Sequence, residues 1–149
     1  RVPGTLQGRV VLQGRSDHSG ASVSSSLSKS RSDSTTSDRN GRFAIATSQG
    51  EGFYTITIAK QGYLSAVSER PVKMTVDAVV DLGEIALIGG DVNDDNEIDV
   101  RDLSYVAWHF DEQDPKADIN SDGIVDILDL SLIAGNFGRT GPVEWKVSD

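Results

Sequence analysis

One twelve-residue acidic pattern occurs twice in this chain, with the copies 27 residues apart. The first copy, loop 1, is DVNDDNEIDVRD from Asp91 to Asp102, and the second, loop 2, is DINSDGIVDILD from Asp118 to Asp129. Both copies place Asp at positions 1, 5, 9 and 12, Asn at position 3 and a branched aliphatic residue at position 8. A repeat with oxygen-bearing side chains at fixed alternate positions indicates two copies of one local backbone structure.

The spacing is typical of a calcium loop of the EF-hand type, in which six to eight oxygen atoms surround the ion. In loop 1 the predicted ligands are the side chains of Asp91, Asn93, Asp95, Asp99 and Asp102 and the backbone carbonyl of Glu97. In loop 2 they are the side chains of Asp118, Asn120, Asp122, Asp126 and Asp129 and the backbone carbonyl of Ile124. The sequence therefore predicts two bound calcium ions.

Each loop carries four aspartates among its predicted ligands, and like charges repel at such short range. Metal binding and folding are therefore expected to be coupled. Position 6 needs a sharp turn, which Gly123 adopts without steric cost and Asn96 tolerates better than most residues.

A helix is expected after each loop. Apolar residues follow the loops at i, i+3, i+4 and i+7, which is one stripe of a helix. They are Leu103, Val106, Ala107 and Phe110 after loop 1, and Leu130, Ile133, Ala134 and Phe137 after loop 2. No amphipathic helix precedes either loop, so the sequence supports a loop followed by a helix, which is half of an EF-hand.

The segment before the loops is rich in β-forming residues separated by turn signals. It predicts about seven short strands in a small antiparallel β-sandwich. The expected strands lie at 5–13, 21–27, 42–47, 53–59, 62–69, 71–80 and 81–87. Residues 28–39 are almost all polar and are interpreted as a surface loop, with contact to a sugar or an ion as the alternative. Asn40-Gly41 predicts a hairpin turn.

The charge of the chain is divided unevenly. Residues 1–90 hold 10 Lys/Arg and 8 Asp/Glu, whereas residues 91–149 hold 4 and 15, which gives the net charge of −9. This acidity disfavours nucleic acid as a partner. The two halves are interpreted as two domains, joined at Gly89-Gly90 by a linker so short that the domains touch unless the joint flexes.

The remaining composition points to an extracellular setting. The chain has no cysteine, so calcium is the expected staple of a small acidic domain. No apolar run is long enough for a membrane helix, and the first residues do not resemble a signal peptide. We therefore expect a C-terminal piece of a larger secreted protein, monomeric when alone, with no membrane insertion.

The acidic half resembles a known family. GDVNDDNEIDVRDLSYVAWHF followed by ADINSDGIVDILDLSLIAGNFG is similar to a dockerin, over about residues 89–145. The resemblance implies a calcium-dependent module that docks onto a cohesin domain in cellulosomes and related assemblies for polysaccharide degradation.

The β half has a likeness of its own. DSTTSDRNGRFAIATSQGEGFYTITIAKQGYLSA resembles the carboxypeptidase-regulatory-like domain, an Ig-like or prealbumin-like sandwich, and the X-module that precedes some dockerins. The predicted fold class is therefore multidomain, with an antiparallel β-sandwich at residues 1–88 followed by a small α-helical dockerin domain at 89–149.

The dockerin resemblance also implies a partner-binding surface at loop positions 10 and 11 and along the following helix. Those places hold Val100, Arg101, Tyr105, Trp108 and His109 in the first copy, and Ile127, Leu128, Leu132, Asn136 and Arg139 in the second. Internal packing of Ile127 and Leu128 is the alternative. Many cellulosomal dockerins carry Ser-Thr at positions 10 and 11, so this chain is not expected to bind the same cohesins. The copies differ, which predicts a single binding mode.

Catalysis is not expected. The two histidines, His18 and His109, are interpreted as structural or surface residues, and no hydrolase motif is present. Two alternatives to docking stay open, which are a calcium-stabilised stalk without a cohesin partner and carbohydrate binding by the sandwich. Trp145 near the C-terminus either clasps the start of the dockerin-like segment or lies in a disordered end.

Overall fold

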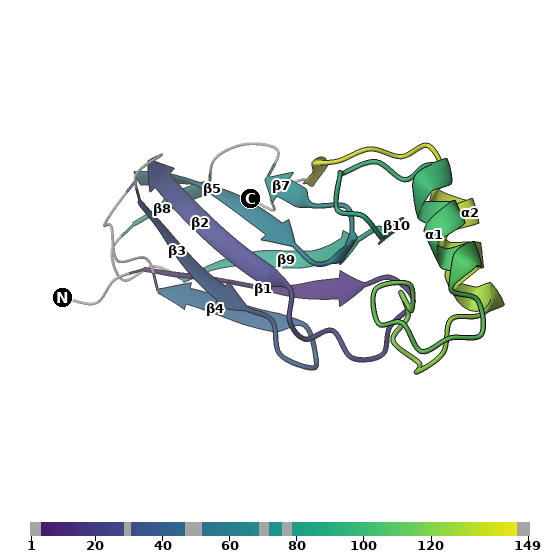
Figure 1. Cartoon of the computed structure of the whole chain (residues 1–149). Coiled ribbons are helices and arrows are strands. Elements are labelled where there is room, and N and C mark those ends of the chain that lie inside the picture. The colour runs from purple at the N-terminus through teal and green to yellow at the C-terminus, as the bar shows by residue number, and fades with distance from the viewer. Residues whose placement is uncertain (1–3, 29–30, 47–51, 69–71, 76–78, 146–149) are drawn as a thin grey trace.

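The computed structural model describes residues 4–28, 31–46, 52–68, 72–75 and 79–145. Two β-sheets form two layers, and two helices lie at the end of these layers that is farthest from the N-terminus (Figure 1). The three-stranded sheet has the order β4-β1-β9, formed by Arg42–Ala46, Thr5–Leu12 and Val79–Leu87.

The second sheet has six strands. Its main path is β11-β7-β5-β2-β3, and β8 pairs with β5 beside that path. The strands are β11 Val143–Trp145, β7 Ala66–Ser68, β5 Gly52–Ala59, β2 Ser22–Ser28, β3 Arg31–Thr36 and β8 Val72–Met74.

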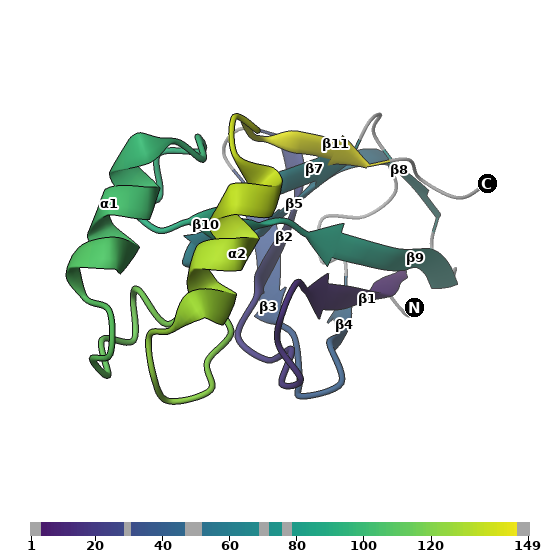
Figure 2. The same ribbon diagram turned by 90° about the vertical axis from the view of Figure 1, so that its right-hand side faces the viewer.

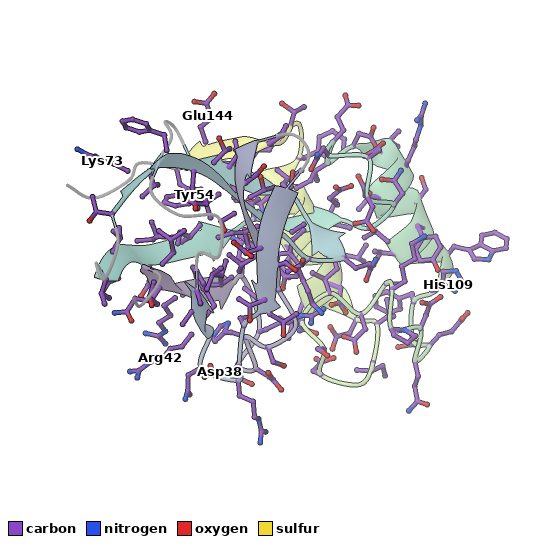
Figure 3. All side chains as sticks on the ribbon, turned by 90° about the vertical axis from the view of Figure 1, so that its left-hand side faces the viewer. Asp38, Arg42, Tyr54, Lys73, His109 and Glu144 are labelled. Carbon is purple, nitrogen blue, oxygen red and sulfur yellow. The ribbon has the colours of Figure 1, made fainter. Side chains whose placement is uncertain are left out.

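The sheets bury alternate residues of their strands. In β5, Tyr54, Ile56 and Ile58 are buried, whereas Phe53 and Thr55 are exposed. Figure 3 places Tyr54 between the sheets, whereas Lys73 of the paired strand β8 points away from the molecule. This alternation is what a strand with one buried face requires.

Three features of the β half differ from the expectation. The expected surface loop at 28–39 contains the strand β3, because its backbone pairs with β2 although its side chains are polar. β1 and β9 pair in parallel, so the sandwich is not wholly antiparallel. Nine strands, rather than about seven, lie in the described residues before Ile88.

Asn40-Gly41 forms a turn, but the turn does not close a hairpin. It joins β3 and β4, which pair with β2 and β1 in different sheets. Asp38 accepts hydrogen bonds from the backbone amides of Asn40 and Arg42, both at 2.9 Å. Gly41 has φ +84°, and a Cβ there would collide with the carbonyl of Val10.

A short ladder joins the sheets to the helices. β10 (Gly89–Asp91) pairs with β6 (Gly62–Tyr63), so the first residue of loop 1 is already part of a strand. The helices are α1 (Val100–Trp108) and α2 (Ile127–Asn136), and they lie side by side in both ribbon views (Figure 2).

The predicted multidomain fold class, a sandwich followed by a separate small α-helical domain, is wrong. Over the described residues the structure is mostly β-sheet, its two helices have only 9 and 10 residues, and the buried apolar side chains belong to one core. That core joins residues of the strands to Val92, Ile98, Val106, Ala117, Ile119, Val125 and Ile133. Two helices this short cannot enclose a core alone, so they share the core of the sheets. The division into sequence modules at 88/89 stays a prediction.

Polar contacts add to this shared core. The side-chain amide of Asn136 on α2 donates to Gln13 Oε1 at 2.7 Å and to the Gly89 carbonyl at 2.8 Å. Gln13 Oε1 also accepts from the Gly89 amide at 2.9 Å. The end of β1, the β10 strand and α2 therefore meet at one hydrogen-bonded junction.

This junction predicts a measurable loss of stability. We expect Asn136→Ala to lower the free energy of unfolding by about 1–3 kcal/mol, because it removes the side-chain donor to the buried Gly89 carbonyl. Urea unfolding at saturating calcium is the measurement. Gln113→Ala, at an exposed position, is the control and should change stability by less than about 0.5 kcal/mol. Equal effects of the two substitutions would contradict the account of the junction.

Candidate metal centre

Loop 1 brings three carboxylates close together. Oxygen atoms of Asp91, Asp95 and Asp102 all lie within 4.8 Å of one another. Asp91 is 1% exposed and Asp102 is fully buried, whereas Asp95 faces solvent. A second group of carboxylates in the same loop, Asp95, Glu97 and Asp99, meets the same limit. Loop 1 therefore concentrates negative charge around a small volume.

Backbone amides hold these carboxylates in place. Asp91 accepts from the amides of Asp95 at 3.1 Å and Asn96 at 2.8 Å, which closes the loop on its first residue. Asp102 accepts from the amides of Val92 at 2.8 Å and Asp99 at 2.9 Å. The first and last predicted ligands are thus held by the loop's own backbone.

Loop 2 repeats this arrangement. Asp118 accepts from the amides of Asp122 at 3.3 Å and Gly123 at 2.8 Å, and Asp129 accepts from the amide of Asp126 at 2.9 Å. Oxygen atoms of Asp118, Asp122 and Asp129 again lie within 4.8 Å of one another. The two sequence copies have therefore folded into copies of one structure.

Positions 9 and 12 also start the helices. Asp99 is the N-cap of α1 and Asp126 that of α2, with φ −143° in both and ψ −166° and −168°. Each forms a capping box with the aspartate three residues later, Asp102 or Asp129. Carboxylates at helix N-termini are favoured by the unpaired amides there. This explains why a helix follows each loop directly.

The two copies are tied to each other in a crossed pattern. Ile98, at position 8 of loop 1, donates to the carbonyl of Arg139 and accepts from the amide of Gly138, after α2. Val125, at position 8 of loop 2, bonds in the same way to Asp111 and Glu112, after α1. Each loop is therefore closed by the segment that follows the other loop's helix.

The electrostatics of the loops disfavour bare carboxylates. Burial raises the pKa of Asp91 to about 6, against an ordinary 3.8, and the nearby Asp102 adds to this rise. Burial likewise raises the pKa of Asp102, Asp118 and Asp129. These four residues are the first and last predicted ligands of the two loops. A cation placed among them would offset both desolvation and mutual repulsion.

The donor set fits calcium. All predicted side-chain ligands carry oxygen, which is the donor that calcium prefers. At position 3, the Oδ1 atoms of Asn93 and Asn120 accept from the backbone amides of Asp95 at 3.4 Å and Asp122 at 3.3 Å, so both face the fifth position of their own loop. The metal roles of these residues, and of the Glu97 and Ile124 carbonyls, stay predictions.

Residues of the β half also support the loops, and no sequence motif marked them for this role. Arg15 Nε donates to the Ile119 carbonyl at 2.7 Å, and its guanidinium lies 5.4 Å from the ring centroid of Tyr63. Tyr63 donates its hydroxyl to the Gln13 carbonyl at 2.7 Å, and Gln61 donates to the Val92 carbonyl at 3.1 Å. These contacts join residues far apart in sequence, so no local pattern could reveal them.

The predicted partner-binding residues divide by exposure. Val100, Trp108, Ile127 and Leu128 are 61%, 82%, 63% and 56% exposed, and Arg101 and Arg139 also face solvent. Ile127 and Leu128 are therefore not packed inside the molecule, which was the alternative left open by the sequence.

The other four predicted positions are less accessible. Tyr105 and His109 are half-buried, and each makes a side-chain contact to the segment after α1, where Tyr105 donates to Asp114 at 2.9 Å and His109 lies 3.0 Å from Glu112. Leu132 is half-buried and packs on the core. Asn136 is 7% exposed and serves the junction with Gln13, so it is not available as a surface residue.

Beside α2 runs an open groove of about 400 Å³. Its lining includes Gln13, Gly14, Leu128, Leu132 and Gly135. The groove therefore lies between the start of α2, where Leu128 is exposed, and the residues that follow β1. No helix in the described residues is long and apolar enough to cross a membrane.

Comparison with known proteins defines the fold but not the family. The sequence matches no protein-family model and no curated protein. Among solved structures, the chain matches a fold found in crystal structures of type II cohesin–X-dockerin complexes from Acetivibrio cellulolyticus. One of these, a mutant of the N-terminal interface, matches with a TM-score of 0.75 and 23% identity.

A second such structure, a mutant of the C-terminal interface, matches with a TM-score of 0.73 and 23% identity. Each match covers 92% of this chain and 97% of the other chain. One alignment thus spans the sheets and the helices together, in agreement with the single core. At this identity the likeness shows the fold alone.

The pKa of Asp91 predicts a pH dependence for the calcium-free protein. Because its pKa is raised in the folded state, this carboxyl stabilises the fold below about pH 4 and loses that contribution as the pH rises through about 6. We expect the calcium-free chain to lose on the order of 2 kcal/mol of stability between pH 4 and 7 through this group. Urea unfolding at a series of pH values measures it.

The control is a pair of substitutions. Asp91→Asn should make the profile less steep, with the remaining slope due to Asp102, Asp118 and Asp129, whose pKa values are also raised, whereas Asp111→Asn, at an exposed position, should leave the slope nearly unchanged. A profile that is equally steep in the wild type and in Asp91→Asn would contradict the assignment to Asp91.

Proposed function

We propose that this chain is a calcium-dependent protein-docking module, and that it forms the dockerin side of a cohesin–dockerin pair. The observation that carries the proposal is the duplicated acidic loop, whose two copies share one carboxylate cluster at positions 1, 5 and 12, the same closing hydrogen bonds and the same helix caps. The fold shared with a chain of cohesin–X-dockerin complexes supports it.

Those complexes contain both partners, so the side of the pair has to be argued from this chain. The similarity of GDVNDDNEIDVRD and ADINSDGIVDILD to the duplicated dockerin loop favours the dockerin side. The β layers would then act in the manner of an X-module. They lie against the loops and contact both of them through Arg15, Gln61 and Tyr63.

Calcium would act here as a structural ion. The side chains of the predicted ligands would hold one ion in each loop, with the Glu97 and Ile124 carbonyls completing the sets. Two divalent ions would balance part of the net charge of −11 carried by residues 91–149, in which 15 Asp/Glu face 4 Lys/Arg. Since both helices start at ligand residues, loading the loops would fix where α1 and α2 begin.

The docking surface would lie on the exposed starts of the helices. Val100 and Arg101 begin α1, and Ile127 and Leu128 begin α2. Exposed apolar residues beside one another commonly mark protein contacts, and Arg and Trp often dominate their energy. Because the two pairs differ in chemistry, a single binding mode is favoured over a flipped pair of modes.

The module would be non-catalytic and would act outside the cell. It would anchor a secreted protein, such as a polysaccharide-degrading enzyme, to a cohesin-bearing scaffold, and it would be a monomer by itself. A structural stalk is the second candidate, because both loops are bonded to the sheets, and such bonds would stiffen a terminal segment without any partner.

A pull-down tests the docking role. The immobilised chain is offered a panel of purified cohesins and, separately, a panel of dockerins, in calcium and in chelator. We expect a cohesin to be retained in calcium only. We also expect at least about a tenfold loss of affinity for Ile127→Asp combined with Leu128→Asp, since charges would replace a buried apolar contact.

The matched control is Val79→Asp, because Val79 is 64% exposed on β9, away from the helices. It should bind the cohesin as the wild type does. Retention of a dockerin instead of a cohesin would reverse the assigned side. Retention of neither, with calcium still bound, would favour the stalk.

A further inference from the structure

The two loops differ at position 6. In loop 2 this position is Gly123, with φ +97°, and a Cβ there would meet no atom within 4 Å. In loop 1 it is Asn96, which holds a φ of +63° although it is not glycine. A non-glycine residue in the left-handed region is costly unless other contacts hold it there. Asn96 has such contacts.

The side chain of Asn96 lies between loop 1 and the larger sheet. Its Oδ1 accepts from both the amide and the hydroxyl of Ser65, each at 3.0 Å. Ser65 lies between β6 and β7, so this contact reaches from the loop to the start of a sheet strand. The backbone amide of Asn96 donates to Asp91 Oδ2 at 2.8 Å, so the same residue also contacts the first predicted ligand of loop 1.

The same two residues position the C-terminal strand. The backbone carbonyl of Asn96 accepts from the backbone amide of Gly141 at 2.7 Å, and the backbone carbonyl of Ser65 accepts from the backbone amide of Val143 at 2.8 Å. Gly141 fits closely, since a Cβ there would lie 2.9 Å from Asn96 Oδ1. Directly afterwards, β11 pairs with β7 from Val143 to Trp145.

These contacts form a continuous relay. It runs from the Asp91 carboxylate through Asn96 to Ser65, and from both of them to the segment that begins β11. Val143 and Trp145 pack against the core, whereas Glu144 points away from the molecule (Figure 3). The environment of the Trp145 ring therefore depends on whether β11 is paired with β7.

Among the described residues, loop 2 has no counterpart to this relay. Its backbone reaches the β half through the Ile119 carbonyl, which accepts from Arg15 and from Tyr63. Those residues follow β1 and lie in β6, and neither belongs to β11 or β7. Filling loop 2 would therefore act on a different part of the sheets.

We propose that Asn96 is a positioning residue that couples calcium binding in loop 1, but not in loop 2, to the seating of strand β11 on the sheet. This inference rests on the proposed calcium sites. It gives the two sites different roles: the ion in loop 1 fastens the C-terminal strand to the sandwich, whereas the ion in loop 2 does not.

Trp145 fluorescence tests the coupling. Trp108→Phe serves as the background, because the chain has two tryptophans and Trp108 is 82% exposed. Calcium is titrated into the full chain while Trp145 emission is followed, and calorimetric titration counts the ions bound. We expect calcium to shift the emission in the background protein.

Matched variants separate the two loops. Asp95→Asn, which weakens the loop 1 site, should abolish the Trp145 response, whereas Asp122→Asn, at the same position of loop 2, should leave it intact. Asn96→Gly should keep two bound ions yet lose the response, because glycine suits the backbone but carries no acceptor. Asn96→Asp, in contrast, should keep the Trp145 response, since Asp supplies an oxygen at the same place and tolerates this φ.

Two further variants complete the design. Ser65→Ala removes one of the two donors to Asn96 and should reduce the response without abolishing it, which keeps the test informative if Asn96→Gly does not fold. Gly123→Asn should leave the response unchanged, because a side chain there meets no partner.

The outcomes distinguish this inference from the proposed function. If no calcium binds to the background protein, the calcium sites themselves fail. If two ions bind and Asn96→Gly responds as the background does, or if the response follows Asp122→Asn, the coupling through Asn96 is overturned while the calcium sites stand.

Discussion

The crowding of carboxylates within each loop is the constraint on which the rest of the structure depends. Asp91 and Asp102 are buried within hydrogen-bonding reach of the loop's own amides, and Asp118 and Asp129 repeat this in the second copy. Those amides favour the charged carboxylates, but burial outweighs them and, together with the neighbouring aspartates, raises the pKa values of these carboxyls. Asp102 and Asp129 also lie in the first turns of α1 and α2, so the position of both helices is tied to how this charge is balanced.

The two loops are alike in geometry but not in their surroundings. Each is closed at position 8 by the segment after the other loop's helix, and this reciprocal pairing makes the helical part behave as one unit. That unit has too little apolar surface to stand alone, and it completes its core on the sheets through residues such as Ile119 and Ile133. Loop 1 is joined to the larger sheet by Asn96, whereas position 6 of loop 2 faces solvent.

The features that could be predicted from the sequence are those that depend on residues close to one another in the chain. The hydrogen bonds within the loops join residues only two to ten positions apart, so the loops and helix starts followed from the ligand spacing, and strands such as β5 followed from their local content of β-forming residues. The strand β3 could not be found in this way, because pairing with β2 holds its polar residues. The parallel pairing of β1 with β9 and the role of Asn136 depend on residues more than 70 positions apart. The uneven charge also suggested two domains, although charge on the surface does not reveal whether the interior is shared.

The central claim is that the duplicated loops bind calcium, and the most direct test counts the ions. Calorimetric titration of the metal-free chain with calcium should give two ions per chain, and Asp102→Ala or Asp129→Ala should each reduce the count to one, because each removes a buried final ligand. A chain that binds no calcium, or that still binds two ions when both aspartates are replaced, would contradict the account.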